Sequence, residues 1–326
     1  MVHLVTEEIN CCPVCKGNDK EFWSTANDRL HHTTEQTFEY SRCLNCEALY
    51  QSIRPIQEDI WKCYPNNYGP HRKLHQRNTL LKVPKWLNGV AHHLADRLVG
   101  AYAFRQRIVQ VEAHLKQGMR MLDFGCGAGK YLDRARKFGC ITIGMDFSSQ
   151  ALDQVRSRGH QALPIDDSSW ETVGVGTVGF VRMNHVIEHL YDPEKVLRVI
   201  CRAMSPGGIL HLSTPNPNGP SANRYRSAWW GLECPRHIVL IPPHRMAQIL
   251  ESAGFNKIEI VHEPLAKDLV RSWAYARVDR GLLSSSSVEG LAEDGLLNLW
   301  FGRMVARALK RGESTDRYHI FAYNGG

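Results

Sequence analysis

The stretch Met121-Leu122-Asp123-Phe124-Gly125-Cys126-Gly127-Ala128-Gly129 decides the fold. Apolar residues followed directly by closely spaced glycines are typical of a buried strand that turns into a helix. Glycine has no side chain to collide, so the backbone at such a turn can come close to a ligand. A dinucleotide fingerprint, G-x-G-x-x-G, would need a glycine at position 130, where this chain has lysine. The pattern is G-x-G-x-G and therefore argues against a dinucleotide.

Acidic residues beside this turn indicate what the ligand carries. Asp123 lies two residues before the first glycine, where a carboxylate would repel a pyrophosphate but suits the ammonium group of an amino-acid-bearing nucleoside. The next apolar run ends in Asp146, an acid able to accept both hydroxyls of a ribose; the alternative is a cap of the following helix. Asp166, with Asp167 as its competitor, is a candidate for the adenine amino group, and either could cap a turn.

Strand and helix patterns alternate from residue 119 onward, which predicts a doubly wound parallel sheet with ligands at the carboxyl ends of its strands. The final helix of the core has a C-terminal glycine, Gly254. Predicted strands cover 119–123, 140–146, 161–165, 178–183, 209–213, 257–263 and 318–323. Predicted helices cover 130–138, 149–158, 193–204 and 244–253, and the third of these stops at Pro206-Gly207-Gly208.

Four ordered motifs carry a family resemblance: LDFGCGAG, GMDFSSQAL, NHVIEHLYDP and MSPGGILHLSTPN. Over about residues 118–260 the chain resembles the class I S-adenosylmethionine (SAM)-dependent methyltransferases. The resemblance implies an α/β, Rossmann-like sheet of seven strands, mostly parallel with one antiparallel strand near its end, and SAM as cofactor. Such families usually carry Asp early in the fourth strand, where this chain has Gly179. The candidate cofactor-binding residues are Asp123, Gly125, Cys126, Gly127, Gly129, Asp146, Phe147, Asp166 and Asn184.

Four cysteines form two C-x-x-C pairs, Cys12/Cys15 and Cys43/Cys46, separated by 27 residues. In a chain with no secretion signal, such pairs indicate metal binding before disulfides. Four thiolates make a closed tetrahedral site, which favours a structural zinc over a catalytic one. Cys11 is a competitor of Cys12, and reduced structural cysteines are the alternative.

The N-terminal arrangement CPVC…RCLNCEALYQS…YPNNYGP is similar to that of bacterial zinc-ribbon methyltransferases encoded with polysaccharide and deoxysugar pathways, including nucleotide-sugar C-methyltransferases. This resemblance covers residues 10–70 and implies a sugar acceptor, as a nucleotide-sugar or a surface-glycan precursor. In those enzymes a histidine after the fifth strand is proposed as base, and His237 matches it. The acid that usually precedes that histidine is replaced here by Arg236, so oxygen methylation is at least as well supported as carbon methylation.

Methyl transfer needs positioning, and a base when the acceptor must lose a proton. His237 is the first candidate base, with a buried structural histidine as the alternative. Glu188 and His189 follow the fourth predicted strand and are further catalytic candidates, although both also suit the start of a helix. Around His237 the sequence is rich in aromatic residues, which suits a saccharide or phosphate-bearing acceptor.

The chain has 326 residues and a formal charge of +7, and ten Lys or Arg against two acids lie between positions 71 and 120. Such a basic stretch attracts anions, or is a solvated helical face. We expect a zinc-ribbon-like region over 1–70, a basic helical connector over 71–118 and a SAM domain over 119–326. No apolar run approaches a membrane span and the N-terminus lacks a leader pattern, so we expect a cytoplasmic enzyme.

Two features leave alternatives open. Residues 296–311 predict a basic amphipathic helix that either packs on the protein or lies on a membrane surface. The acceptor alternative is a small metabolite such as a quinone-type phenol, since the SAM core is shared. From another functional class, zinc ribbon plus basic stretch would suit a nucleic-acid-binding or -modifying protein, although few aromatic residues lie among the basic ones.

Overall fold

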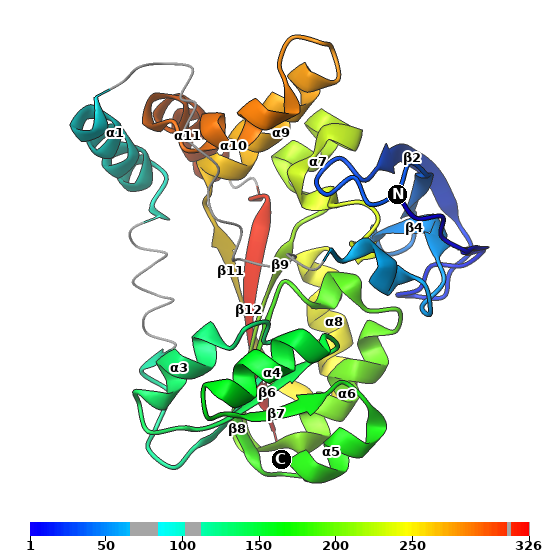
Figure 1. Ribbon diagram of the computed structural model, residues 1–326, viewed down its shortest axis with the longest axis vertical. Coiled ribbons are helices and arrows are strands. Elements are labelled where there is room, and N and C mark those ends of the chain that lie inside the picture. The colour runs from blue at the N-terminus through cyan, green and yellow to red at the C-terminus, as the bar shows by residue number, and fades with distance from the viewer. Residues whose placement is uncertain (66–83, 102–111, 312–313, 326) are drawn as a thin grey trace. The chain divides into compact units, whose positions relative to one another are not determined.

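The computed structural model describes residues 1–65, 84–101, 112–311 and 314–325, and the chain divides into two compact units (Figure 1). Unit 1 comprises Met1–Arg105, Pro215–Pro242 and His262–Tyr318, and unit 2 comprises Gln106–Thr214, Pro243–Val261 and His319–Gly326. This division differs from the three consecutive regions expected from the sequence. Residues 215–242 and 262–318 fold with the N-terminal region through long-range contacts, which local sequence patterns do not predict.

Unit 2 is built on a seven-stranded sheet, which confirms the predicted Rossmann-like fold. Its strand order is β11-β12-β9-β8-β5-β6-β7. Parallel ladders join β5 to β6 and β8, β6 to β7, and β8 to β9. The strands are β5 (Arg120–Phe124), β6 (Ile141–Asp146), β7 (Gln161–Pro164), β8 (Val178–Asn184), β9 (Met204–Pro215), β11 (Phe255–Glu263) and β12 (Arg317–Asn324).

The last strand, β12, runs antiparallel to β9. Asn324 ends β12, and its Nδ2 donates to the carbonyl of Met204, the first residue of β9, at 2.8 Å. The carbonyl of Asp316, just before β12, accepts from the N–H of Asn216, just after β9, at 2.9 Å. The two strands therefore point in opposite directions, as the family resemblance implied.

Among the described residues, five helices accompany this sheet, and side-chain caps fix where several of them begin. Ser148 caps α4, Asp166 caps α5 and Asp192 caps α6. The short α5 was not predicted from the sequence. Helices α3 and α4 contact β5, β6 and β7, whereas α6 contacts both α5 and α8. The helices are α3 (Lys130–Arg136), α4 (Ser149–Ser157), α5 (Asp167–Val173), α6 (Pro193–Ala203) and α8 (Pro243–Ala253).

Two sequence features of unit 2 are explained by packing. A Cβ at Gly179 would lie 2.8 Å from the Met119 side chain, so the missing acid leaves space that Met119 fills. The helix predicted over 193–204 ends at Ala203, just before Pro206-Gly207-Gly208, and β9 begins at Met204 and continues through this segment. Neighbouring register partners on β8 are two residues apart where those on β9 are five apart, so the segment is a bulge within the strand.

Unit 1 contains a separate sheet of five strands in the order β1-β4-β3-β2, with β10 also paired to β4. All its ladders are antiparallel. Because Val239 in β10 pairs with Tyr50 in β4, the segment 215–242 joins the N-terminal sheet. Its core brings Phe38 and Tyr40 together with Trp229. The strands are β1 (Thr6–Glu8), β2 (Lys20–Asn27), β3 (Thr37–Cys43), β4 (Leu49–Pro55) and β10 (Val239–Leu240).

Helices supply the rest of unit 1, around a second apolar core that includes Leu269, Val270 and Phe301. The predicted tail helix is present as α11, capped by Asp294. The serine run at 284–287 contains the 3-10 turn η5. The elements are η1 (Ile60–Cys63), α1 (Lys85–Leu98), α7 (Pro220–Tyr225), η3 (Arg226–Ala228), η4 (Trp230–Leu232), α9 (Ala266–Val278), η5 (Ser285–Ser287), α10 (Val288–Ala292) and α11 (Gly295–Lys310).

The helical connector predicted for 71–118 is observed in part. Its middle forms α1, which starts directly after Pro84. Residues 71–83 and 102–111 lie outside the described residues, together with much of the basic stretch. Among the helices that the structure describes, none combines the length and apolar character needed to cross a bilayer.

Candidate functional site

The glycine-rich turn follows β5, as predicted. Gly125, Gly127 and Gly129 all have left-handed φ angles, of 75°, 51° and 80°, which favour glycine. A Cβ at Gly125 would collide with Val186, so that position also needs glycine for space. At Gly127 no atom of the described part of the chain lies within 4 Å of where a Cβ would stand, so its backbone borders open space there.

Asp146 ends β6 and is tied to the glycine turn. Its Oδ2 accepts the N–H of Gly127 at 2.9 Å, and its Oδ1 accepts the N–H of Ser148 at 2.9 Å. Burial raises the pKa of Asp146, while these backbone donors oppose the rise. The cap of α4 is Ser148, so Asp146 is not itself the helix cap that sequence left as an alternative. Each carboxylate oxygen keeps capacity to accept a further hydroxyl.

Asp123 lies in β5, buried, and its partner is Arg182 in β8. The two residues are register neighbours, and Arg182 Nη1 contacts Asp123 Oδ1 at 3.1 Å. Burial raises the pKa of Asp123 and the guanidinium opposes that rise. The second oxygen, Oδ2, is buried and has no hydrogen-bond partner among the residues that the structure describes. A buried carboxylate oxygen without a donor fits a ligand that brings one, such as an ammonium group.

The other predicted cofactor residues lie on the same edge of the sheet or just beyond it. Cys126 is buried within the turn, and Asn184 is the last residue of β8. Phe147 follows Asp146 and its side chain is 58% exposed, so it is available to a ligand. Asp166 caps α5 through Ser169, and its role toward an adenine stays a prediction.

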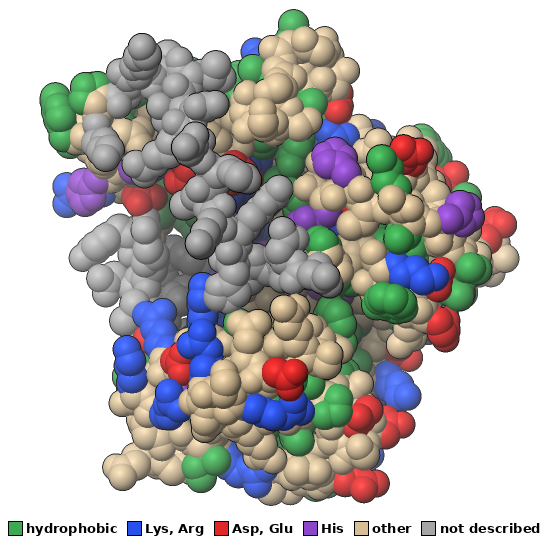
Figure 2. Space-filling model, in the orientation of Figure 1, with side chains coloured by type: hydrophobic (Ala, Val, Ile, Leu, Met, Phe, Trp, Pro, Cys, Tyr) green, Lys and Arg blue, Asp and Glu red, His purple; other side chains and the backbone are tan. Residues whose placement is uncertain are grey.

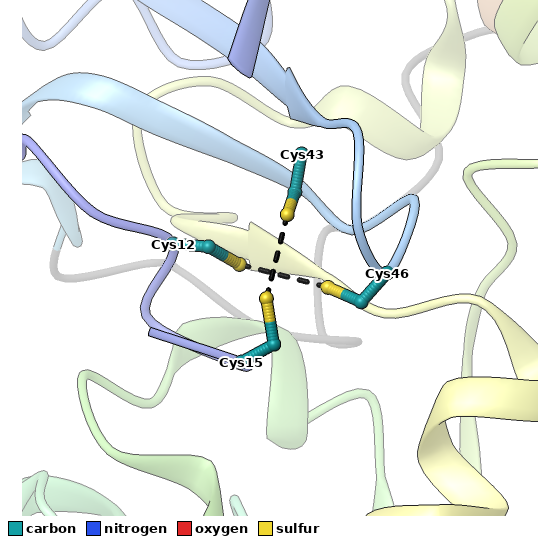
Figure 3. A group of neighbouring side chains, drawn as sticks. All are labelled: Cys12, Cys15, Cys43 and Cys46. Carbon is teal, nitrogen blue, oxygen red and sulfur yellow. Dashed lines mark hydrogen bonds between the residues drawn. The ribbon is translucent and has the colours of Figure 1, made fainter. Parts of the chain in front are cut away.

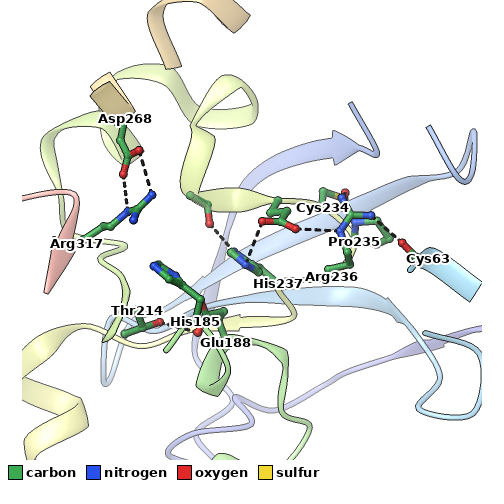
Figure 4. A network of polar contacts seen from close by, with 12 residues as sticks. Cys63, His185, Glu188, Thr214, Cys234, Pro235, Arg236, His237, Asp268 and Arg317 are labelled. Carbon is green, nitrogen blue, oxygen red and sulfur yellow. Dashed lines mark hydrogen bonds and ion pairs between the residues drawn. The ribbon is translucent and has the colours of Figure 1, made fainter. Parts of the chain in front are cut away.

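Glu188 lies in the 3-10 turn η2 (Ile187–His189) after β8, and its side chain is buried. Its Oε1 contacts Nδ1 of His185 at 3.0 Å, and its Oε2 accepts the Thr214 hydroxyl at 3.1 Å (Figure 4). These bonds join the ends of β8 and β9, which is a structural role. His189 is the last residue of the same turn and is partly exposed.

In unit 1, His237 is buried within the segment that joins the N-terminal sheet. Its Nδ1 contacts the Gly231 carbonyl at 2.8 Å and its Nε2 lies 3.6 Å from Glu233 Oε2 (Figure 4). Because a carbonyl only accepts, Nδ1 carries the proton of the neutral ring, which leaves Nε2 basic. The backbone carbonyl of His237 accepts from Tyr40 and Gln51, so the N-terminal sheet fixes the position of this residue.

Arg236 stands where the resemblance to sugar C-methyltransferases implied an acid. In the structure it makes several contacts within unit 1. Its side chain is fully buried and contacts Asp28 Oδ1 at 2.9 Å, Glu233 Oε1 at 3.1 Å and the Cys63 carbonyl at 3.1 Å. Burial alone would raise the pKa of Asp28, but the hydrogen bond and the charge of Arg236 outweigh burial and lower this pKa to about 2. Arg236 therefore fastens the His237 segment to the N-terminal region.

The four predicted metal ligands converge in unit 1 (Figure 3). All four sulfurs lie within 4.8 Å of one another. Cys12 and Cys46 are 3.7 Å apart, and Cys15 and Cys43 are 3.4 Å apart, all as free thiols. A tetrahedron with Zn–S bonds of about 2.3 Å has sulfur–sulfur edges of about 3.8 Å. The arrangement therefore fits a four-thiolate zinc.

The two cysteine knuckles are built alike, which supports the metal interpretation. The residues after each pair, Lys16 and Glu47, have left-handed φ angles of 62° and 60°. Each N–H donates to the carbonyl of the first cysteine of its pair, at 2.9 and 3.0 Å. A hydrogen bond from Cys46 lowers the pKa of Cys12 to about 5. Thiolate is the form that binds metal.

Comparison with known proteins agrees with this geometry. Residues 91–260 match the family model of a methyltransferase domain. The chain belongs to this methyltransferase family. With the glycine turn, Asp146 and the unpartnered oxygen of Asp123, the family assigns SAM as the cofactor of unit 2.

Relatives of this methyltransferase include a ubiquinone biosynthesis O-methyltransferase from Bordetella avium, 30% identical over 35% of this chain and 49% of the relative. A probable S-adenosylmethionine-dependent methyltransferase from Mycolicibacterium smegmatis is 31% identical over 48% of this chain and 60% of the relative. The chain thus spans about half the length of these curated relatives. A solved SAM-dependent methyltransferase from Archaeoglobus fulgidus has a TM-score of 0.48 and 20% identity, over 68% of this chain and 94% of that one.

Sequence reasoning missed several residues of this methyltransferase's site. Arg182 was not singled out, although an arginine inside the apolar run FVRMN was a usable signal. Beyond it, His211 in β9 is the register neighbour of Arg182, and its Nε2 lies 3.0 Å from His319 Nδ1 in β12. A polar row therefore crosses the sheet from Asp123. The pairing of Arg236 with Asp28, 208 residues away, left no local signal.

Proposed function

We propose that this protein transfers the methyl group of SAM to an oxygen of a small hydroxylated acceptor. The observation that carries the proposal is the pair of acids around the glycine turn, with Asp146 bound to Gly127 and Asp123 holding an unpartnered buried oxygen. In the reaction an acceptor oxygen bonds to the methyl carbon while the sulfur–carbon bond breaks. The sulfur keeps that electron pair, S-adenosylhomocysteine leaves, and the acceptor proton passes to a base.

The chain's own residues then have separate tasks. Asp146 binds the ribose hydroxyls and the Asp123 carboxylate faces the ammonium charge. Asp166 accepts the adenine amino group, beside Phe147, Cys126 and Asn184. Arg182 positions Asp123 by its 3.1 Å contact. The four cysteines hold a structural zinc that fixes the sheet to which the His237 segment is attached.

His237 is the proposed general base. The Gly231 carbonyl holds the proton on Nδ1, so Nε2 is the atom that takes the acceptor proton. The Glu233 carboxylate, 3.6 Å from Nε2, stabilises the imidazolium that results. Catalytic roles for Glu188 and His189 stay predictions, and the contacts of Glu188 with His185 and Thr214 favour a structural role for it.

A phenolic hydroxyl is the first acceptor class we propose. Support comes from the relatives named as ubiquinone biosynthesis O-methyltransferases, which modify oxygen. This favours the quinone-type phenol over the sugar expected first from the sequence. A phenol also loses its proton readily, so one histidine suffices as base.

A sugar hydroxyl is the second candidate, and one observation in unit 1 favours it. A small cavity there is lined by Arg29, Trp230, Glu233 and Tyr275, among others. The rings of Trp230 and Tyr275 stack at 5.8 Å, and the Arg29 guanidinium lies 5.2 Å from the Tyr275 centroid. Aromatic faces beside charged groups are a lining that suits a sugar ring and its hydroxyls.

The test is a transfer assay with the full, zinc-loaded chain and SAM labelled in its methyl group. Catechols with a polyprenyl or carboxyl substituent are compared with nucleotide-sugars, and the product is located by mass spectrometry. We expect an O-methylated phenol and a fall in kcat of about 10²- to 10⁴-fold for His237→Ala, with the SAM affinity unchanged. Methylation at carbon or nitrogen, or full turnover by His237→Ala, would refute the proposal; salt-dependent RNA binding without transfer would favour a nucleic-acid function.

A further inference from the structure

The apolar residues of α1 lie on two different faces. Ala91, Ala95 and Val99 are buried. In contrast, Trp86, Val90, Leu94 and Leu98 recur every four residues and are 71%, 47%, 48% and 43% exposed. A helix of a soluble protein normally turns its apolar stripe to the core and its polar residues to water. Helix α1 carries a second apolar stripe, Trp86–Val90–Leu94–Leu98, which we call the outer stripe.

Helix α11 lies beside α1 in unit 1 and points the same way. Near the start of both helices, Asn88 Oδ1 accepts the N–H of Gly295 at 2.6 Å. Further along, a Cβ at Gly302 would lie 3.3 Å from Val99. Glycine at these two positions lets the helices approach closely, so the buried face of α1 is already occupied by α11.

The surface of α11 that stays exposed extends the outer stripe. Phe301 and Val305 are buried in unit 1, so they are not available to a partner. Trp300 remains 55% exposed and Leu296 39% exposed. The sequence left membrane contact as one of two alternatives for α11 alone, whereas most of the exposed apolar side chains belong to α1. Figure 2 shows apolar side chains gathered over α1.

Cations lie at one end of this surface. Leu98, the last residue of the outer stripe, lines a groove with Arg303, Ala306, Arg307 and Lys310. The three basic side chains are exposed, as is Arg97 on α1. The exposed apolar side chains of α1 and α11, which include Trp86 and Trp300, therefore lie on helices that also carry a group of positive charges.

We propose that the outer face of α1 and α11 docks on the surface of an anionic lipid bilayer. Aliphatic side chains that enter the acyl boundary, tryptophans at the headgroup level and arginines on lipid phosphates are the groups such a surface recognises. The positive charges match anionic lipid headgroups, and the apolar stripe matches the acyl chains beneath them. Contact is peripheral, since no described helix is able to span a membrane.

The experiment is vesicle co-sedimentation of the full, zinc-loaded chain, with phosphatidylcholine alone and with phosphatidylcholine mixed with phosphatidylglycerol. We expect binding only to the anionic vesicles. Trp86→Ser combined with Leu94→Ser should weaken it about tenfold or more, and Arg303→Gln combined with Arg307→Gln should weaken it about fivefold per charge. The matched control is Trp61→Ser, because Trp61 is 61% exposed and belongs to η1 rather than to α1 or α11, and its loss should change nothing.

A second measurement needs no variant: brominated lipids should quench the tryptophan fluorescence of the wild-type chain. Three outcomes would overturn the proposal. These are no binding by the wild-type chain, equal binding by Trp86→Ser/Leu94→Ser, and a concentration-dependent dimer that this double variant dissolves, which would identify a second copy as the occupant.

Discussion

Unit 2 and unit 1 of this methyltransferase are specified by their sequences in different ways. In unit 2 the parts of the proposed cofactor site are local: the glycine turn directly follows β5, and Asp146 and Asn184 are the last residues of β6 and β8. Both units are assembled from three separate segments, but in unit 1 the first segment carries the four-thiol cluster and is joined to the second by long-range contacts such as Arg236–Asp28. We infer that unit 2 depends mainly on its apolar core, whereas unit 1 depends on a few specific polar links in addition to its two apolar cores.

Zinc removal is expected to have the largest effect and to separate the two units. Cys43→Ser should lose the metal and with it most of the roughly 10–16 kcal/mol that zinc binding provides in small zinc-dependent folds. Hydrogen exchange should then lose protection in β2–β4 while β5, β6 and β8 stay protected. The control is Cys140→Ser, a buried cysteine outside the cluster. Equal loss of protection in both units would contradict the separation.

Breaking the Arg236–Asp28 pair tests whether one buried link holds unit 1 together. Both side chains are fully buried, so Arg236→Met leaves an unpaired carboxylate. We expect a loss of about 3–5 kcal/mol in the free energy of unfolding, measured with denaturant. Asp28→Asn combined with Arg236→Met should recover part of it. A cost below about 1 kcal/mol for Arg236→Met would show that the pair contributes little.

A pH series distinguishes two buried acids of unit 1. Burial raises the pKa of Asp316 to about 6, and the N–H and hydroxyl of Ser221 only partly oppose this. Since the folded value exceeds the unfolded one, the stabilisation is complete below about pH 4 and is lost as pH rises through about 6. Relative to Asp316→Asn, the wild-type free energy of unfolding should fall by about 3 kcal/mol over that window.

Asp28 should show the opposite sign, because its pKa is lowered to about 2. Its contribution is present above about pH 4 and is lost as pH falls toward 2. Equal profiles for Asp316→Asn and the wild-type chain between about pH 4 and pH 7 would be incompatible with a raised pKa for Asp316.

The smallest effect on stability is expected in the glycine turn of unit 2. In Gly127→Ala the new Cβ meets no described atom within 4 Å, so the only cost is the left-handed φ of 51°. The free energy of unfolding should therefore fall by about 1–2 kcal/mol. The loss in the free energy of SAM binding should exceed this loss of stability, since the alanine side chain enters the open space that we assign to the cofactor. Calorimetry on the folded variant measures both quantities. Unchanged SAM binding would place the cofactor elsewhere.

The same contrast between the two units determines how much of the structure could be predicted from the sequence. The seven-stranded sheet and the glycine turn were predictable, because each strand and its ligand-facing residue are contiguous in the chain. Helix α5 was missed because Asp167–Val173 is short and largely polar. The pairing of Val239 with Tyr50 was beyond reach, since a two-residue strand has no periodicity of its own. Helical spacing in α1 predicted the helix, but could not tell that Trp86 and Leu94 face outward.

The measurement that tests the central claim most directly is calorimetric titration of the folded, metal-quantified chain with SAM, repeated with Asp146→Ala. The control is Asp153→Ala, an exposed acid on α4 in the same unit. We predict micromolar-range binding by the wild-type chain and by the control, and none by Asp146→Ala. A folded, zinc-loaded chain that fails to bind SAM, or binds it equally well without Asp146, would contradict the assignment of unit 2 as the cofactor site.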